Sequence, residues 1–166
     1  MYNVKTFIIS LLVLIFFVPL HSYSGQIGTM APAFSLVDLN GRTISLEQFS
    51  GKVVFLDFWA PWCLPCKQEL PELDKLYKNF GKDGFEVIAI SVEPSEKNVA
   101  AFLQKVPLSV HVLIDKKNEV SDAYRVSSLP TGFIIGRDGI IYRVLKGFRI
   151  ESLPIYEKEI DALLKQ

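Results

Sequence analysis

Runs of hydrophobic residues along this 166-residue chain mark out the strands of a sheet. Two nearly continuous apolar runs of strand length, Lys52–Trp59 and Phe85–Val92, predict central strands that are buried on both faces. Three further strands are predicted over Val110–Asp115, Thr131–Gly136 and Ile140–Gly147. A turn of Arg, Asp and Gly separates the last two, so they should form a hairpin.

Other segments repeat their apolar residues with the spacing of a helix. Four helices are predicted, over Cys66–Phe80, Glu96–Lys105, Asn118–Tyr124 and Glu151–Lys165. In the first of these, Pro71 should kink the helix because it lacks a backbone N–H. Ser95 is the expected N-cap of the second helix, and Pro154 leaves the first turn of the last helix uncertain.

Strands that alternate with helices predict a mostly parallel sheet with helices on both faces, and the final hairpin adds an antiparallel edge. The fold class is therefore α/β, a three-layer α/β/α sandwich. Before the first buried strand, the segment Gly28–Gly51 reads as two short extended pieces joined by Asn40-Gly41. Because Asn-Gly between such pieces is a strong hairpin signal, an N-terminal hairpin is expected there.

The first 24 residues differ in composition from the rest of the chain. Lys5 is followed by an apolar run over Phe7–Val18, and Ser22-Tyr23-Ser24 has the small-any-small pattern of a cleavage site. This layout is typical of a secretory signal peptide, and the run is short for a membrane span. An uncleaved membrane anchor and a buried helix are the alternatives. We expect residues 1–24 to direct residues 25–166, a single domain, to the periplasm or another extracytoplasmic compartment.

Composition narrows the classes of function. Lysine plus arginine and aspartate plus glutamate each number 18, so the chain lacks the basic excess of a nucleic-acid-binding protein. Its two cysteines, Cys63 and Cys66, form a C-x-x-C pair. A disulfide between them would close a tiny loop and would be a weak structural staple. A zinc site needs further ligands, and after residue 24 the only other candidate Cys or His is His111.

The position of the pair at a strand–helix junction favours redox chemistry. Cys63 should lie at the N-terminus of the helix, where unpaired N–H groups and the helix dipole stabilise a thiolate. Cys66, one turn further, can attack the resulting mixed disulfide, and Pro65 should stiffen the loop between them. A helix with two inert buried cysteines is the alternative.

The segment "FWAPWCLPCK" resembles the active-site segment of thioredoxins, and Pro71 matches their helix-kinking proline. "VSSLPTGFII" is similar to the loop that carries their cis-proline, which would be Pro130. The N-terminal hairpin and an extra helix and strand between about Pro94 and Asp115 resemble the exported TlpA/ResA-type thioredoxins. The resemblance covers nearly all of residues 25–166 and implies a thioredoxin-like fold with a central helix–strand insertion.

The resemblance also assigns roles to residues around the pair. It implies that Asp57 lies beneath Cys66 and assists its deprotonation, with a hydrogen-bonded structural acid as the alternative. It implies that Glu69 tunes the cysteines, with a solvated helix face as the alternative. Site shaping and substrate contact are expected of the remaining positions, which are Trp59, Trp62, Leu64, Pro65, Leu129 and Pro130. Plain core packing is the alternative for the two tryptophans.

The function predicted from the sequence is that of an exported thiol–disulfide oxidoreductase, acting through a Cys63–Cys66 dithiol–disulfide couple. We expect a monomer with no cofactor and no metal, which reduces disulfides in other exported proteins and draws electrons from a membrane-embedded thiol donor. Reduction of apocytochrome c, the family's best-known task, is one such role. A thiol peroxidase is an alternative, because "APAFSLVDLNG" resembles the start of peroxiredoxins. A copper metallochaperone on this fold is another, although the cysteine spacing does not suit it.

Overall fold

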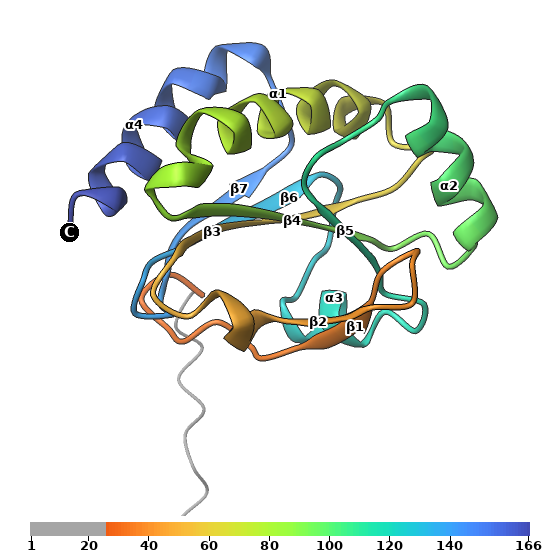
Figure 1. Ribbon diagram of the computed structural model, residues 1–166, viewed down its shortest axis with the longest axis horizontal. Coiled ribbons are helices and arrows are strands. Elements are labelled where there is room, and N and C mark those ends of the chain that lie inside the picture. Colours follow the sequence, from red (N-terminus) through yellow and green to blue (C-terminus); the bar gives the residue numbers. More distant parts are fainter. Residues whose placement is uncertain (1–25) are drawn as a thin grey trace, which may run out of the picture.

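A five-stranded sheet forms the centre of the computed structural model, which describes residues 26–166 (Figure 1). Its strand order is β5-β4-β3-β6-β7. The strands are β3 (Val53–Trp59), β4 (Phe85–Ser91), β5 (His111–Ile114), β6 (Thr131–Ile135) and β7 (Ile141–Lys146). Every residue of β3, β4 and β6 is buried, as the continuous apolar runs predict for β3 and β4.

The sheet is mixed in the predicted way. Strands β3, β4 and β5 are parallel, while β6 runs antiparallel to β3 and pairs with β7 as an antiparallel hairpin. In this register, Asp57 of β3 lies between Ala89 of β4 and Gly132 of β6. The carboxyl group of Asp57 therefore sits in the centre of the sheet, where a polar side chain is costly.

Three helices cover one face of the sheet (Figure 1). They are α1 (Leu64–Phe80), α2 (Glu96–Lys105) and α4 (Leu153–Leu164). Alternate residues of β3 point to this face, so Val53, Phe55 and Trp59 share a core with apolar residues of all three helices. Both cysteines belong to the same core.

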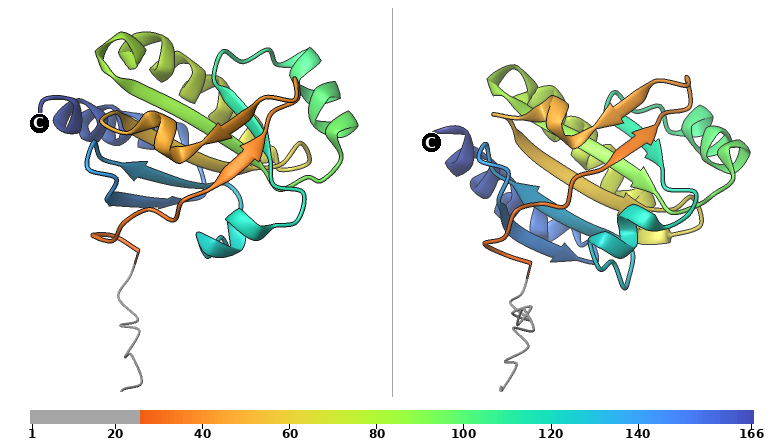
Figure 2. Two further views of the ribbon diagram at one scale, coloured as in Figure 1. Left: turned by 60° about the horizontal axis from the view of Figure 1, so that its bottom comes forward. Right: turned by 90° about the horizontal axis from the view of Figure 1, so that it is seen from below.

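The opposite face is covered by a hairpin and one short helix (Figure 2). The hairpin consists of β1 (Ser35–Val37) and β2 (Thr43–Ser45), is followed by the 3-10 turn η1 (Leu46–Phe49), and lies near α3 (Glu119–Ala123). Tyr124 ties these parts together: its ring packs against Phe34 and Phe133, and its hydroxyl donates to the carbonyl of Pro32 at 2.7 Å. The sequence predicted helices on both faces of the sheet, but on this face the covering layer consists of the hairpin together with the single short helix α3.

Helix boundaries agree with the sequence prediction to within a few residues. Helix α2 spans the predicted residues, and the Ser95 side chain accepts the predicted capping hydrogen bond from Asn98 N–H at 3.3 Å. Helix α1 begins two residues earlier than predicted and continues as one helix through Pro71. The last helix is shorter than predicted, because the 3-10 turn η3 (Ile150–Ser152) precedes it and Pro154 occupies its first turn. Another 3-10 turn, η2 (Gly81–Asp83), follows α1.

The predicted signal peptide, residues 1–24, lies outside the described residues. Within residues 26–166, no helix combines the length and the apolar character that crossing a membrane requires.

Candidate active site

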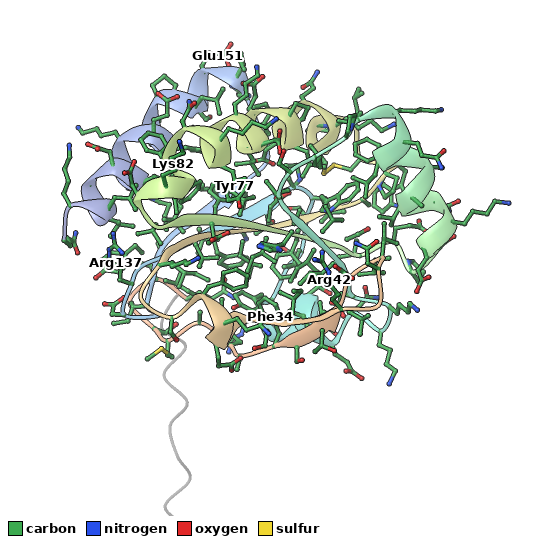
Figure 3. The ribbon with its side chains drawn as sticks, in the orientation of Figure 1. Phe34, Arg42, Tyr77, Lys82, Arg137 and Glu151 are labelled. Carbon is green, nitrogen blue, oxygen red and sulfur yellow. A yellow bond between two sulfur atoms is a disulfide. The ribbon has the colours of Figure 1, made fainter. Side chains whose placement is uncertain are left out.

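Cys63 and Cys66 are joined by a disulfide at the carboxyl end of β3, where the chain turns into α1 (drawn in yellow in Figure 3). The S–S distance is 2.04 Å and the two Cα atoms lie 5.3 Å apart. The pairing confirms the predicted disulfide. Cys63 keeps 6% of its surface exposed and Cys66 keeps none, so Cys63 is the more accessible of the two to an incoming thiol or disulfide.

Cys63 is the N-cap of α1, as the sequence predicts. Its sulfur accepts a hydrogen bond from the backbone N–H of Cys66 at 3.2 Å, and Pro65 occupies the first turn. The N-terminal N–H groups of a helix have no partner within the helix and carry its positive dipole end. A thiolate on Cys63 would therefore gain a hydrogen bond and a favourable field, whereas Cys66 lies inside the first turn.

Two carboxyl groups are buried on the α1 side of the sheet. Asp57 of β3 is 0% exposed and Glu69 of α1 is 1% exposed. Burial raises the pKa of Asp57 far above its usual range, and burial together with the charge of Asp57 raises the pKa of Glu69. These positions rule out the solvated helix face that the sequence left open for Glu69. In the part of the chain that the structure describes, neither oxygen of Asp57 has a hydrogen-bond partner.

Tyr156 of α4 completes this buried polar group and was not anticipated from the sequence. The residue is 2% exposed, and burial together with the charges of Glu69 and Asp57 raises its pKa. Sequence periodicity indicates only that Tyr156 lies on the inner face of a helix, as do Ile160 and Leu163. No sequence signal separates a tyrosine that is influenced by buried carboxyl groups from one that merely fills the core.

The peptide bond between Leu129 and Pro130 is cis, as predicted from the resemblance. Beside it, a groove of about 550 Å³ opens next to the disulfide. Trp62, Cys63 and Pro65 line one wall, and α3 with residues 126–129 lines the other. The sequence did not point to the α3 wall, which adds Asn118, Ser121 and Asp122 to the groove. Contact between Pro130 itself and Cys63 stays a prediction.

The residues expected to contact a substrate fall into two groups. Trp62 and Leu64 are 66% and 68% exposed and flank Cys63, so they remain candidates, together with Pro65 and Leu129. Trp59 is fully buried and packs against Phe102 of α2, with ring centroids 4.9 Å apart. The expectation that Trp59 contacts a substrate therefore does not hold. Trp59 is the last residue of a central strand, and its buried ring packs in the core behind the cysteines.

Metal binding finds no support in the described residues, among which no group of three or more His, Cys, Asp and Glu side chains could hold an ion. His111 lies on β5, which is an edge strand of the sheet. It packs against Phe49 and lies 3.6 Å from a carboxylate oxygen of Glu86 on the hairpin face of the sheet. The cysteines belong to the core of the other face, so His111 does not join them.

Comparison with known proteins agrees with this geometry. The model of the AhpC/TSA family matches residues 27–144, which is more than half of the chain. The chain belongs to the AhpC/TSA family. The names of its relatives indicate which reaction this member of the family catalyses.

A thiol-disulfide oxidoreductase ResA from Bacillus thuringiensis is 40% identical over 136 residues, covering 81% of this chain and 79% of the relative. The ResA protein of Bacillus subtilis is 41% identical over 126 residues, covering 76% of this chain and 70% of the relative. Among solved structures, a Chlorobium tepidum protein described as a thiol:disulfide interchange protein DsbE superimposes with a TM-score of 0.82 at 34% identity. That match covers 85% of this chain and 99% of the other.

These relatives, the bonded Cys63–Cys66 pair and the fold identify this AhpC/TSA-family member as a thioredoxin-like thiol–disulfide oxidoreductase. The enzyme class predicted from the sequence is confirmed. The family name alone would have left the peroxidase alternative open, but the named relatives and the paired cysteines favour disulfide exchange.

Proposed function

We propose that this protein reduces disulfides in other exported proteins, with Cys63 as the attacking thiol and Cys66 as the resolving thiol. The observation that carries the proposal is the position of Cys63. Its sulfur caps α1, accepts the Cys66 N–H and belongs to the more exposed of the two cysteines. Of the two thiols, only Cys63 combines access with stabilisation of the thiolate, which is the species that attacks a disulfide.

The exchange has two steps. In the first, the Cys63 thiolate attacks one sulfur of the substrate disulfide, a mixed disulfide forms, and the other substrate sulfur leaves as a thiolate. In the second, Cys66 gives up its proton and attacks the sulfur of Cys63. The Cys63–Cys66 disulfide forms, the mixed disulfide breaks, and the second substrate thiolate leaves. Two electrons have then passed from the protein to its substrate.

Asp57 is proposed to accept the proton of Cys66 in the second step, while Glu69, whose pKa burial and the charge of Asp57 raise to about 10, keeps its proton and tunes the site as its neighbour. An ordinary carboxylate, with a pKa of about 4, is a poor base for a thiol with a pKa of about 8.5. Burial raises the pKa of Asp57 to about 8, which brings its basicity close to that of the thiol. Proton transfer is most efficient between groups matched in this way.

Leu64 and Pro65 bear on the direction of electron flow. Neither side chain can donate a hydrogen bond to a thiolate on Cys63. The reduced form therefore has only the helix terminus and the nearby Lys67 to stabilise it, which favours a protein that gives electrons away. A reductant outside the cytoplasm must be recharged, and we propose that a membrane-embedded dithiol donor reduces the Cys63–Cys66 disulfide.

Export rests on residues 1–24, whose pattern is that of a signal peptide or anchor. The substrate is proposed to be an extended segment with a disulfide, because the consecutive residues 126–129 line the groove beside Cys63. Apocytochrome c, whose cysteines must be reduced before haem attachment, fits this description and is supported by the resemblance to the TlpA/ResA type.

Three assays on the purified protein separate the proposed function from its rivals. Reduction of insulin in the presence of dithiothreitol tests disulfide reduction, turnover of hydrogen peroxide tests a thiol peroxidase, and copper retained after dialysis tests a metallochaperone. We expect activity in the first assay alone, and Cys63→Ser should abolish it. Peroxide turnover without insulin reduction would overturn the proposal.

A further inference from the structure

Trp62, the residue directly before Cys63, separates two grooves and lines both of them. The first is the groove of about 550 Å³ beside the disulfide, called the α3 groove after its outer wall. The second, called the α2 groove, has a volume of about 360 Å³ and is walled by α2, Pro61 and Lys67. Helices α2 and α3 cover opposite faces of the sheet (Figures 1 and 2), so a segment bound over Cys63 can reach both grooves across Trp62.

The α3 groove carries a negative charge. Asp122 is the one acidic or basic residue among the described residues that line it. The backbone N–H of Asp122 donates to the carbonyl of Asn118 at 2.9 Å, which fixes the residue in the single turn of α3, and the residue is exposed. A surface aspartate is ionised at neutral pH, so this groove favours a basic side chain.

The α2 groove carries the opposite charge. Lys67 of α1 and Lys105 at the end of α2 both line it and are exposed. Glu93 also lines it, but this carboxylate is engaged at the start of α2. Its Oε1 accepts from the backbone N–H of Ser95 at 3.1 Å and from the side-chain amide of Asn98 at 3.2 Å. The balance is positive, which favours an acidic side chain.

The charges of the two grooves are not neutralised within the molecule. None of the ion pairs found in residues 26–166 includes Asp122, Lys67 or Lys105. Charges elsewhere on the same helices do have partners: Glu96 of α2 lies 2.6 Å from Lys116, and Glu119 of α3 lies 3.6 Å from Lys117. The groove charges are therefore available to a bound partner.

We propose that the two grooves select and orient the substrate by charge. A disulfide-bearing segment lies across Trp62, with a basic side chain in the α3 groove and an acidic side chain in the α2 groove. The inference rests on the proposed reduction of disulfides in other proteins, and it names the class of segment that is reduced. A segment bound in the reverse direction would meet two repulsions in place of two attractions, so charge fixes its direction as well as its identity.

Three peptides of equal length serve as probes, each with one cysteine in a mixed disulfide with neutral 2-thiopyridine. The first has lysine two residues before the cysteine and glutamate two residues after it, and the second has the two exchanged. Two residues span about 7 Å in an extended chain. The third has glutamine at both places. The first two have the same composition and net charge, so they differ only in the direction of the charge pattern.

The reaction follows the two steps of disulfide exchange. The Cys63 thiolate attacks the peptide sulfur, the bond to the pyridyl sulfur breaks, and pyridine-2-thione leaves. Cys66 then attacks the sulfur of Cys63, and the peptide leaves as a thiol. Absorbance of the thione gives the second-order rate constant of the first step, and chromatography gives the yield of peptide thiol.

The variants change the groove charges one side at a time. Asp122→Asn and Lys105→Gln each remove one charge, and the Asp122→Lys/Lys105→Glu double variant reverses both grooves. Lys67 is left unchanged because it lies near the Cys63 thiolate. Glu119→Gln on α3 and Lys97→Gln on α2 are the matched controls, since both residues are exposed and neither lines a groove. Thermal unfolding establishes that each full-length variant is folded.

We expect wild type to react about four- to thirtyfold faster with one of the two charged peptides than with the other, and with the glutamine peptide at an intermediate rate. Exposed ion pairs have individually small effects, and four of them add up to this range. Asp122→Asn and Lys105→Gln should each lower the ratio, and the controls should keep it. The double variant should prefer the other peptide. In 1 M NaCl, where the Debye length is about 3 Å, the ratio should approach one.

Equal rates for the two charged peptides in wild type would overturn this inference alone, and so would a preference that the double variant retains. Disulfide reduction itself would then still stand. If the reduced protein released no peptide thiol from any of the three peptides, the proposed function would fail and this inference with it.

Discussion

The backbone N–H of Cys66 donates a hydrogen bond to the sulfur of Cys63 at 3.2 Å. This contact makes the two cysteines unequal even though they are neighbours in one motif. Cys63 receives the bond at the end of the helix, and Cys66 supplies it from inside the first turn. The chemistry proposed for the site depends on that inequality.

The first prediction concerns which thiol reacts. When the reduced protein is treated with limiting iodoacetamide near pH 7, Cys63 should be modified first, because its thiolate is stabilised and it is the more exposed cysteine. Peptide mapping by mass spectrometry gives the ratio of the two products. Preferential modification of Cys66 would reverse the assignment of attacking and resolving thiols.

The second prediction concerns redox poise. Because the side chains of Leu64 and Pro65 offer no donor to the thiolate, the reduced form should be only weakly stabilised. The reduction potential should lie near that of thioredoxin, about −270 mV, rather than near the oxidising extreme of about −120 mV. Equilibration with glutathione and dithiothreitol buffers measures it. A value above about −180 mV, the isomerase range, would make the protein a donor of disulfides.

The third prediction uses the buried carboxyl group of Asp57. Its pKa is raised by burial in the folded state, so the protein binds a proton more tightly when folded than when unfolded. The associated stability is present below the unfolded pKa of about 4 and is lost as the pH rises toward the folded value of about 8. Asp57→Asn removes this loss, and its midpoint of thermal unfolding should exceed that of wild type by more at pH 8 than at pH 5.

The comparison is made in the oxidised protein, so that the cysteines do not titrate. Asp122→Asn, at an exposed position of α3, is the matched control and should show a nearly constant difference from wild type. A gain for Asp57→Asn that does not grow with pH would contradict the assignment of a strongly raised pKa.

The fourth prediction concerns Arg137, at the end of the molecule where α4 finishes (Figure 3). Its guanidinium donates to the carbonyl of Gly51 at 2.7 Å and to those of Asp83 and Leu164 at 3.2 Å each. It thus ties the β6–β7 turn to three other parts of the chain. Arg137→Ala should lower the free energy of unfolding by about 1–3 kcal/mol, as expected for charged hydrogen bonds that are partly exposed.

Arg137→Lys should recover little of this loss, since a single ammonium cannot reproduce the planar fork that reaches three carbonyls. Urea titrations of both variants measure the effect, with Lys97→Ala on the exposed side of α2 as the control. If Arg137→Lys were as stable as wild type, charge alone would explain the contribution of Arg137.

The fifth prediction concerns the packing beside Asp57. A Cβ at Gly132 would come within 2.8 Å of the Phe55 ring, which in turn packs on Tyr156. Gly132→Ala should therefore cost about 1–3 kcal/mol through overpacking. Gly81→Ala is the control, because a Cβ there comes no closer than 3.3 Å to the Tyr77 ring. Equal stability of the two variants would show that Phe55 shifts freely.

Local signals in the sequence were sufficient for most of the fold. The apolar run at β3 predicted a strand that is buried on both faces. The capping residue Ser95 and the apolar residues at helical spacing after it predicted both ends of α2. The hairpin was predicted from Asn40-Gly41, but a turn signal does not say which face of the sheet a hairpin will cover.

The site was predicted less completely, because burial depends on distant segments. Cys63 and Cys66 followed from their motif, whereas the burial of Glu69 depends on α4, which follows more than 80 residues later. Trp59 and Trp62 are three residues apart and are alike in sequence terms. One ends a central strand and is buried, and the other lies in the exposed turn after it. Their different burial follows from the course of the backbone after β3, which the sequence alone does not give.

Trapping the mixed disulfide tests the central claim most directly. Reduced Cys66→Ser protein, incubated with oxidised insulin, should accumulate a covalent adduct, since the second step cannot occur. Mass spectrometry should find the substrate peptide joined to Cys63, and Cys63→Ser should form no adduct under the same conditions. An adduct through Cys66 in the Cys63→Ser protein, with none through Cys63 in Cys66→Ser, would contradict the proposed mechanism.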